Sequence, residues 1–292
     1  MTRTELATRR IPVRGLTLSV AEAGPGNGPL TLLLHGFPET WWGWRHQIGP
    51  LAAAGLRVVA PDQRGYGLSS RPEGIAAYHL DCLAGDVVGL ADALGHDRFR
   101  VVGHDWGGVV AWWVAARYPD RLDRMAILNA PHPDLFGAYA RRHPSQALRS
   151  LYVGLFQLPV LPEALLSAGD GAALRRALTQ SSRPGAFSTE DLDRYAVAWR
   201  RPGALTAMLN WYRALRLPRE PAPGPIRPPV LVLWGERDTA LERGLAAASL
   251  RLCAQGAVRS FTHATHWLQH EEPEAVNEAL IGFLTASAAS QV

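Results

Sequence analysis

Short apolar runs alternate with helical patterns along most of the chain. The runs are rich in Val, Ile and Leu, as is typical of strands buried on both faces of a parallel sheet. They are Leu30–Leu34, Arg57–Ala60, Phe99–Val102, Met125–Leu128, Val230–Trp234 and Val258–Phe261. Helical patterns separate most of them, for example Asp81–Leu94, Val109–Arg117 and Glu274–Leu284. This alternation predicts an α/β fold with a doubly wound, mostly parallel sheet.

The alternation stops between about Pro131 and Pro229, where several helical patterns follow one another without a convincing strand. This stretch closes on a proline-rich return, with prolines at 218, 221, 223, 225, 228 and 229. We interpret it as an inserted helical lid, because the sheet needs the strands on both sides of it. The predicted boundaries are 1–134 and 226–292 for the core and 135–225 for the lid. A chain of 292 residues is long enough for one such domain with an insert.

Positions 103–108 read Gly-His-Asp-Trp-Gly-Gly and lie between a predicted strand and a predicted helix. A glycine-flanked nucleophile in that place is the nucleophile elbow of α/β-hydrolases, in which the glycines permit a sharp turn that exposes the central side chain. Here the central residue is Asp105, where most such enzymes have Ser. A carboxylate is already ionised at pH 7 and can attack an sp³ carbon, which leaves an alkyl ester on the enzyme. The pattern therefore predicts cleavage of a C–O or C–halogen bond; the simpler alternative is that Asp105 only caps the helix.

An acid is expected after the nucleophile on this fold. Asp238 comes just past the predicted strand Val230–Trp234, and groups at the carboxyl ends of parallel strands meet at one edge of the sheet. Glu236 is the nearest rival, and Asp134 is another because some relatives carry the acid there. Asp238 is the predicted orienting acid.

A histidine should follow the acid, and His266 lies between the last predicted strand and the last predicted helix. His263 and His270 are close by, so the histidine alone is weak evidence. The following Trp267-x-Gln269 sequence favours His266. We expect it to act as a general base that takes a proton from the water attacking the ester, while Asp238 fixes its tautomer.

The loop that begins at His35 and includes Phe37 and Pro38 follows the first predicted strand. Such a loop can present the main-chain N–H of Phe37, and the elbow supplies a second donor, the N–H of Trp106. Together they would hold the oxyanion formed during ester hydrolysis. Phe37-Pro38 is a candidate cis bond. His35, Pro38 and Trp267 are predicted to line the substrate pocket.

Taken together, these residues make the chain resemble an α/β-hydrolase-fold epoxide hydrolase over nearly its whole length. The matching segments are 35–39, 42–47, 62–70, 103–108, 234–238 and 266–269, and two lid segments, 152–159 and 210–213. The resemblance implies that Tyr152 and Tyr212 donate hydrogen bonds to the epoxide oxygen and protonate it as the ring opens.

Thr265 departs from the pattern, since Gly or Ser is common before the histidine in this family. An alkoxide is a poor leaving group, and a tyrosine with a pKa near ~10 is protonated at neutral pH and can supply the proton. No metal or organic cofactor is expected.

The composition is that of an ordinary globular protein, with 47% hydrophobic and 19% charged residues and a formal net charge of +4. All the basic residues are arginine and are scattered, so a nucleic-acid-binding surface is not expected. The two cysteines form no metal-ligand spacing or disulfide framework. No signal peptide and no 18-residue apolar run is found, which predicts a cytoplasmic protein that does not insert into membranes. The expected partners are an epoxide and water, and the protein is expected to be a monomer or a lid-mediated homodimer.

Two alternative functions remain open at this stage. A haloalkane dehalogenase shares the Asp nucleophile and the tryptophan after it, and a lid tryptophan, Trp199 or Trp211, could help to hold the halide. A ligand-binding protein that keeps the fold without turnover is a second alternative. The complete set of nucleophile, acid and base favours an enzyme. Turnover of an aryl epoxide beside a bromoalkane would separate the three.

Overall fold

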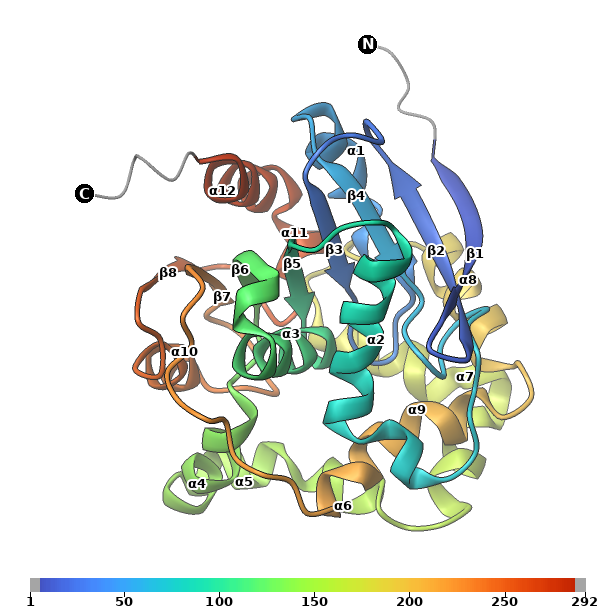
Figure 1. Ribbon diagram of the computed structural model, residues 1–292. Helices are drawn as coiled ribbons and strands as arrows, with labels where there is room; N and C mark the ends of the chain where they lie inside the picture. Colours follow the sequence, from blue (N-terminus) through green and yellow to red (C-terminus); the bar gives the residue numbers. More distant parts are fainter. Residues whose placement is uncertain (1–5, 287–292) are drawn as a thin grey trace.

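A computed structural model of the chain describes residues 6–286. Its centre is an eight-stranded sheet with the strand order β1-β2-β4-β3-β5-β6-β7-β8 (Figure 1). The strands are β1 (Ala7–Val13), β2 (Leu16–Ala23), β3 (Leu30–Leu34), β4 (Arg57–Pro61), β5 (Phe99–His104), β6 (Leu122–Leu128), β7 (Val230–Gly235) and β8 (Gly256–Phe261). Strands β3 to β8 are parallel to one another, whereas β1 and β2 pair antiparallel at one edge. The predicted α/β class and mostly parallel sheet are confirmed.

Helices cover both faces of the sheet. The helices of the core are α1 (Ile48–Ala53), α2 (Leu80–Ala93), α3 (Trp106–Arg117), α10 (Gly244–Leu250), α11 (Leu268–Glu271) and α12 (Pro273–Thr285). One face packs against α2, α3 and α10, and the other against α1 and α12. The central strands β3, β5 and β6 are almost fully buried, which explains their continuous apolar sequence.

The first two strands were missed by the sequence pattern. β1 is mostly exposed along its length and carries Arg9 and Arg10, so it lacks the apolar run that marks the central strands. It is held at the sheet edge by pairing with β2 along its full length. Edge strands of this kind need no continuous apolar run, because one side of the strand faces solvent.

Six helices lie between β6 and β7, and we call them the helical insert. They are α4 (Pro133–Arg142), α5 (Pro144–Arg149), α6 (Leu151–Leu155), α7 (Leu161–Ser181), α8 (Thr189–Trp199) and α9 (Ala204–Arg213). α7 is interrupted at Ala168–Gly171, where three successive residues have positive φ. In Figure 1 the insert lies at the end of the molecule to which β3 and β5 point. The carboxyl ends of the central strands, where a catalytic site is expected, therefore face the insert.

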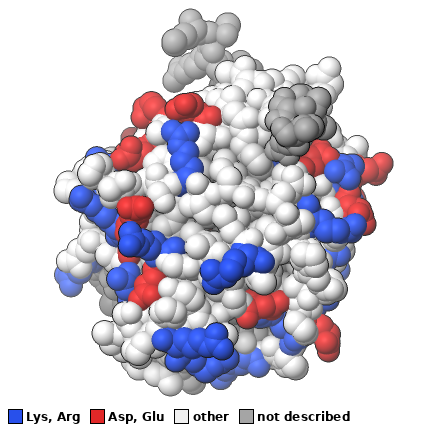
Figure 2. Space-filling view, turned by 90° about the vertical axis from the view of Figure 1, so that its left-hand side faces the viewer, with Lys and Arg blue, Asp and Glu red and all other residues white. Residues whose placement is uncertain are grey.

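The charged side chains do not form a single basic face in the view of Figure 2. Arginines there are interspersed with acidic residues, in keeping with the many arginine–carboxylate pairs of the described chain. No helix within residues 6–286 is both long enough and apolar enough to cross a bilayer.

Candidate active site

The turn between β5 and α3 places Asp105 in a backbone conformation that L-residues seldom adopt. Its φ is 50° and its ψ is −122°. Glycine is required on both sides because the chain folds tightly on itself: a Cβ at Gly103 would lie 2.4 Å from the Gly107 carbonyl oxygen, and a Cβ at Gly107 would lie 2.0 Å from that of Leu34. Such strain is characteristic of functional turns. The Asp105 side chain makes no capping hydrogen bond to α3, so the structure gives no support to a simple helix cap.

The Asp105 carboxylate is held between a main-chain donor and a histidine. Its Oδ1 accepts a 2.8 Å hydrogen bond from the N–H of Phe37, and its Oδ2 lies 3.5 Å from Nε2 of His266. Burial alone would raise the pKa of this carboxyl group, but the contact with His266 and its charge, together with the bond from Phe37, lower the pKa below its usual value. The side chain is still 19% exposed. An ionised, partly accessible carboxylate at an elbow is suited to attack on a substrate.

The loop that supplies Phe37 packs closely against the nucleophile. The Phe37-Pro38 bond is cis, as expected from the sequence. Gly36 lies directly against the nucleophile, where a Cβ would be 2.4 Å from Cβ of Asp105. The other predicted donor, the N–H of Trp106, belongs to the first residue of α3, and such N–H groups have no partner within their helix.

His266 and Asp238 form a close pair behind the nucleophile. The Nδ1 of His266 lies 2.7 Å from Oδ2 of Asp238. The same Oδ2 accepts a 2.6 Å bond from the Asn129 amide, and Oδ1 accepts bonds from the N–H groups of Ala240 and Leu241 at 2.7 and 2.8 Å. Burial would raise the pKa of Asp238, but the charge of His266 and the bonds from His266, Asn129 and Leu241 lower it below its usual value. Burial would lower the pKa of His266, but the carboxylates of Asp238 and Asp105 raise it to about 10.

The rival acids and histidines lie elsewhere. Glu236 lines an outer groove that neither Asp105 nor His266 borders. Asp134 accepts a 2.7 Å bond from Arg219. His263 is bonded to Arg237 at 3.2 Å and His270 to Glu39 at 2.9 Å. Among these candidates the structure brings only His266 to the nucleophile.

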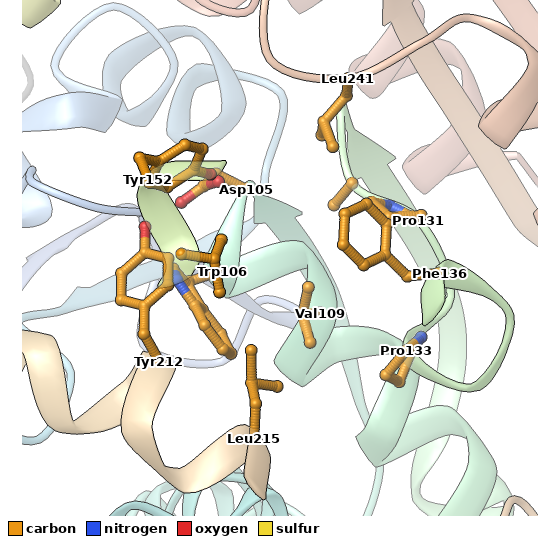
Figure 3. A pocket seen from close by; sticks show the side chains of 12 residues that line it. Asp105, Trp106, Val109, Pro131, Pro133, Phe136, Tyr152, Tyr212, Leu215 and Leu241 are labelled. Carbon is orange, nitrogen blue, oxygen red and sulfur yellow. The ribbon is translucent and has the colours of Figure 1, made fainter. Parts of the chain in front are cut away.

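Two cavities meet at Asp105. The smaller, which we call the Val109 cavity, has a volume of about 100 Å³; the larger, which we call the Trp267 cavity, has a volume of about 560 Å³. Asp105, Tyr152 and Tyr212 border both. Figure 3 shows the hydroxyl groups of both tyrosines directed toward the space beside Asp105. The other lining residues of the Val109 cavity are Trp106, Val109, Ala130, Pro131, Pro133, Phe136, Val153, Leu215 and Leu241.

The two tyrosines come from different helices, α6 and α9. Their ring centroids are 6.0 Å apart. Gln157 bridges the helices by donating to the carbonyl oxygens of Val153 and Tyr212, at 3.2 and 3.0 Å. Arg213, next to Tyr212, donates to the Phe156 carbonyl at 3.1 Å. Gln157 and Arg213, which belong to the two lid segments that match the family, thus hold the helices of the two tyrosines together.

The predicted pocket residues divide into two groups. Pro38 and Trp267 line the Trp267 cavity. His35 lines neither cavity: it is 1% exposed, and its ring bonds to Gly36 and Gln63 of the neighbouring loops. Its side chain is turned inward because Asp62 and Gln63 follow the adjacent strand β4. His35 therefore supports the loop and does not touch the pocket.

Sequence reasoning missed a polar network beneath the site. Glu39 is 1% exposed and accepts bonds from the Tyr195 hydroxyl at 2.6 Å and from His270 at 2.9 Å. His104 donates to the main-chain oxygen of His266 at 2.8 Å and accepts from Gln269 at 3.1 Å. The network anchors the loop that carries His266. The one signal of this network in the sequence was the charged residue Glu39, which directly follows the apolar residues Phe37 and Pro38.

The comparisons with known proteins agree with this geometry. A model of the alpha/beta hydrolase fold family matches residues 29–273. The chain belongs to the α/β-hydrolase fold family. It is 46% identical to AB hydrolase superfamily protein YfhM of Bacillus subtilis, over 94% of this chain and 96% of that one. It is 38% identical to Epoxide hydrolase 4 of Mus musculus, over 94% of this chain and 78% of that one.

A solved structure of Epoxide Hydrolase A from Mycobacterium thermoresistibile superposes with a TM-score of 0.84 at 32% identity, covering 96% of this chain and 98% of that one. The resemblance inferred from the sequence motifs is confirmed, and the chain is a hydrolase. Within residues 6–286 no three His, Cys, Asp or Glu side chains are grouped in a way that could hold a metal ion.

Proposed function

We propose that this hydrolase opens epoxides to vicinal diols through an alkyl ester on Asp105. The observation that carries the proposal is the pair of tyrosine hydroxyls that face Asp105 across the cavities. A carboxylate nucleophile needs an acid on its far side only if the leaving group is a poor one, such as an alkoxide. The relatives named epoxide hydrolase support the same chemistry.

In the first step an Asp105 oxygen attacks one carbon of the epoxide ring. The C–O bond of the ring breaks, and its electron pair moves to the ring oxygen. That oxygen takes a proton from Tyr152 or Tyr212. Tyr212 is buried, and the hydroxyl of Tyr152 is desolvated although its side chain is 40% exposed. This desolvation and the charge of Asp105 raise the pKa of both tyrosines, so both hydroxyls carry their protons in the resting enzyme. The products of the step are an alkyl ester, a free hydroxyl group and a tyrosinate.

In the second step His266 serves as the base. Formation of the ester removes the charge of Asp105 and with it one of the two carboxylates that raise the pKa of His266. The imidazolium proton is then lost more readily and can return to the tyrosinate. Neutral His266 accepts a proton from water, whose oxygen attacks the carbonyl carbon of the ester, Cγ of Asp105. The N–H groups of Phe37 and Trp106 stabilise the oxyanion of the tetrahedral intermediate. The bond between Cγ and the substrate oxygen then breaks, and that oxygen takes the proton held by His266. The diol leaves, and the proton of the new Asp105 carboxyl group returns to His266.

We further propose that residues 135–225, which include all of the helical insert except the first two residues of α4, serve as the lid. It supplies both tyrosines and most of the apolar wall of the Trp267 cavity, including Leu174 and Leu178 of α7. A largely apolar pocket suits the hydrocarbon part of an epoxide.

The dehalogenase alternative gains no support from the lid tryptophans. The indole N–H of Trp199 donates to the Pro38 carbonyl at 2.7 Å, and that of Trp211 donates to the Arg64 carbonyl at 3.1 Å. Both indole N–H groups therefore bond to main-chain oxygens, and neither is directed to the place where a halide would leave. The test is turnover of styrene oxide beside 1-bromobutane: diol formation without bromide release supports the proposal, and bromide release without diol formation overturns it.

A further inference from the structure

The Trp267 cavity holds one fixed positive charge that the proposed chemistry does not use. Its wall is largely apolar and aromatic, and its ionisable residues, besides the tyrosines, are Asp105, His266 and Arg149. The first two belong to the proposed machinery. Arg149 is the last residue of α5, three positions before Tyr152.

Arg149 is held by a main-chain hydrogen bond and not by an ion pair. Its Nη1 donates a 2.7 Å hydrogen bond to the main-chain oxygen of Asp238. A carbonyl oxygen is uncharged, and no ion pair within residues 6–286 includes Arg149. Glu242 lies in the adjoining groove, where bonds from the hydroxyls of Ser145 and Tyr139, and then the charge of Arg149, lower the pKa of its carboxyl group. No ion pair joins its carboxylate to Arg149 in the described part of the chain.

Arg149 also stands at the boundary of the site. An open groove of about 700 Å³ lies outside, and among its lining residues only Arg149 also borders the Trp267 cavity. A guanidinium group has five N–H donors in a planar fork that matches a carboxylate. Thr239, which follows Asp238, lines the cavity beside it and offers a hydroxyl group.

We propose that Arg149 binds an anionic group of the substrate, so that the preferred epoxides carry a carboxylate several bonds from the ring. The carboxylate of Asp105 repels that anionic end and Arg149 attracts it. The two charges therefore orient the substrate with its epoxide toward Asp105 and the tyrosines. The inference rests on the proposed function and adds the substrate class.

The test compares 5,6-epoxyhexanoate with its uncharged primary amide, 5,6-epoxyhexanamide. We expect the wild-type kcat/KM to be on the order of ten-fold higher for the acid, the lower range of a charge-assisted hydrogen bond. Arg149→Met should remove this preference, and Arg149→Lys should retain part of it. Arg142→Met is the matched control, because Arg142 is an exposed arginine of the insert that lines neither cavity, and it should keep the full preference.

A merely structural role for Arg149 would lower kcat/KM for acid and amide alike and leave their ratio unchanged. That result would overturn the inference, as would a wild type that does not prefer the acid. Binding of hexanoate and hexanamide, measured by calorimetry, separates the two proposals. If neither epoxide is turned over, the proposed function fails, but stronger binding of hexanoate that is lost in Arg149→Met would still support the anion site. Equal binding of the two probes would contradict it.

Discussion

Removing the charge of Asp105 should lower the pKa of His266. Asp105→Ala removes the carboxylate, and Asp105→Asn keeps its shape without the charge, as the ester intermediate does. A neighbouring anion favours the protonated imidazolium, so its loss must shift the pKa downward. This coupling is what converts His266 from a resting cation into a base once the ester has formed.

The size of the effect follows from the distance between the two side chains. Nε2 of His266 lies 3.5 Å from Oδ2 of Asp105. Coulomb's law at this distance gives about 1 kcal/mol at the dielectric constant of water and about 5 kcal/mol at an effective value of ~20. The predicted fall therefore lies between about one and about three and a half pKa units, starting from a pKa of about 10 in the wild type.

The assay is a pH titration of the imidazole ¹⁵N resonances, in which the signal absent from His266→Gln identifies His266. The Asn variant is checked by mass spectrometry for deamidation back to Asp. Asp134→Ala is the control, since Asp134 is bonded to Arg219 and not to the triad. An unchanged pKa in both Asp105 variants, or an equal fall in Asp134→Ala, would refute the electrostatic coupling.

Three further predictions follow from the same geometry. His266→Gln should be alkylated by styrene oxide and then stall, and intact-protein mass spectrometry should show an adduct on the peptide that contains Asp105; an unmodified protein would mean that His266 acts before the ester forms. The double variant Tyr152→Phe/Tyr212→Phe should lower the alkylation rate by a factor of roughly 10²–10⁴, which is what general acid catalysis contributes, whereas each single variant keeps one proton donor. Alkylation is measured by rapid-quench kinetics, and a double variant that alkylates at the wild-type rate would contradict the role of the tyrosines. The pKa of His266 is raised on folding, so protonation of His266 should stabilise the fold fully below its unfolded pKa of about 6.5, and this stabilisation should be lost as the pH rises through about 10. Urea unfolding of the wild type and of His266→Gln should therefore show a difference in stability that shrinks over this pH range.

The sequence predicted the parts of the site that depend on local backbone geometry. The elbow around Asp105 needs glycine at two nearby positions, and both the glycines and the cis bond of the Phe37 loop leave a signal in a few adjacent residues. Tyr152 and Tyr212 carry no such signal, since a tyrosine in a helix packs into a core just as readily. Only the resemblance to a family singled them out.

Features that depend on distant contacts could not be predicted. Asn129, for which no role was expected, holds Asp238 through a side-chain bond across 109 positions of the sequence. His35 was expected in the pocket, but its ring turns toward Gln63. Arg149 was one of thirty basic residues until the fold placed it on the cavity wall. In these cases the surroundings of a side chain depend on segments that are far apart in the chain.

A single turnover in H₂¹⁸O tests the central claim most directly. With enzyme in excess over styrene oxide, an ester on Asp105 requires that the oxygen added to the substrate comes from the carboxylate and that water replaces it there. The diol should then carry no label, and the peptide containing Asp105 should gain ¹⁸O. A labelled diol together with an unlabelled peptide would show direct attack by water and would contradict the covalent mechanism.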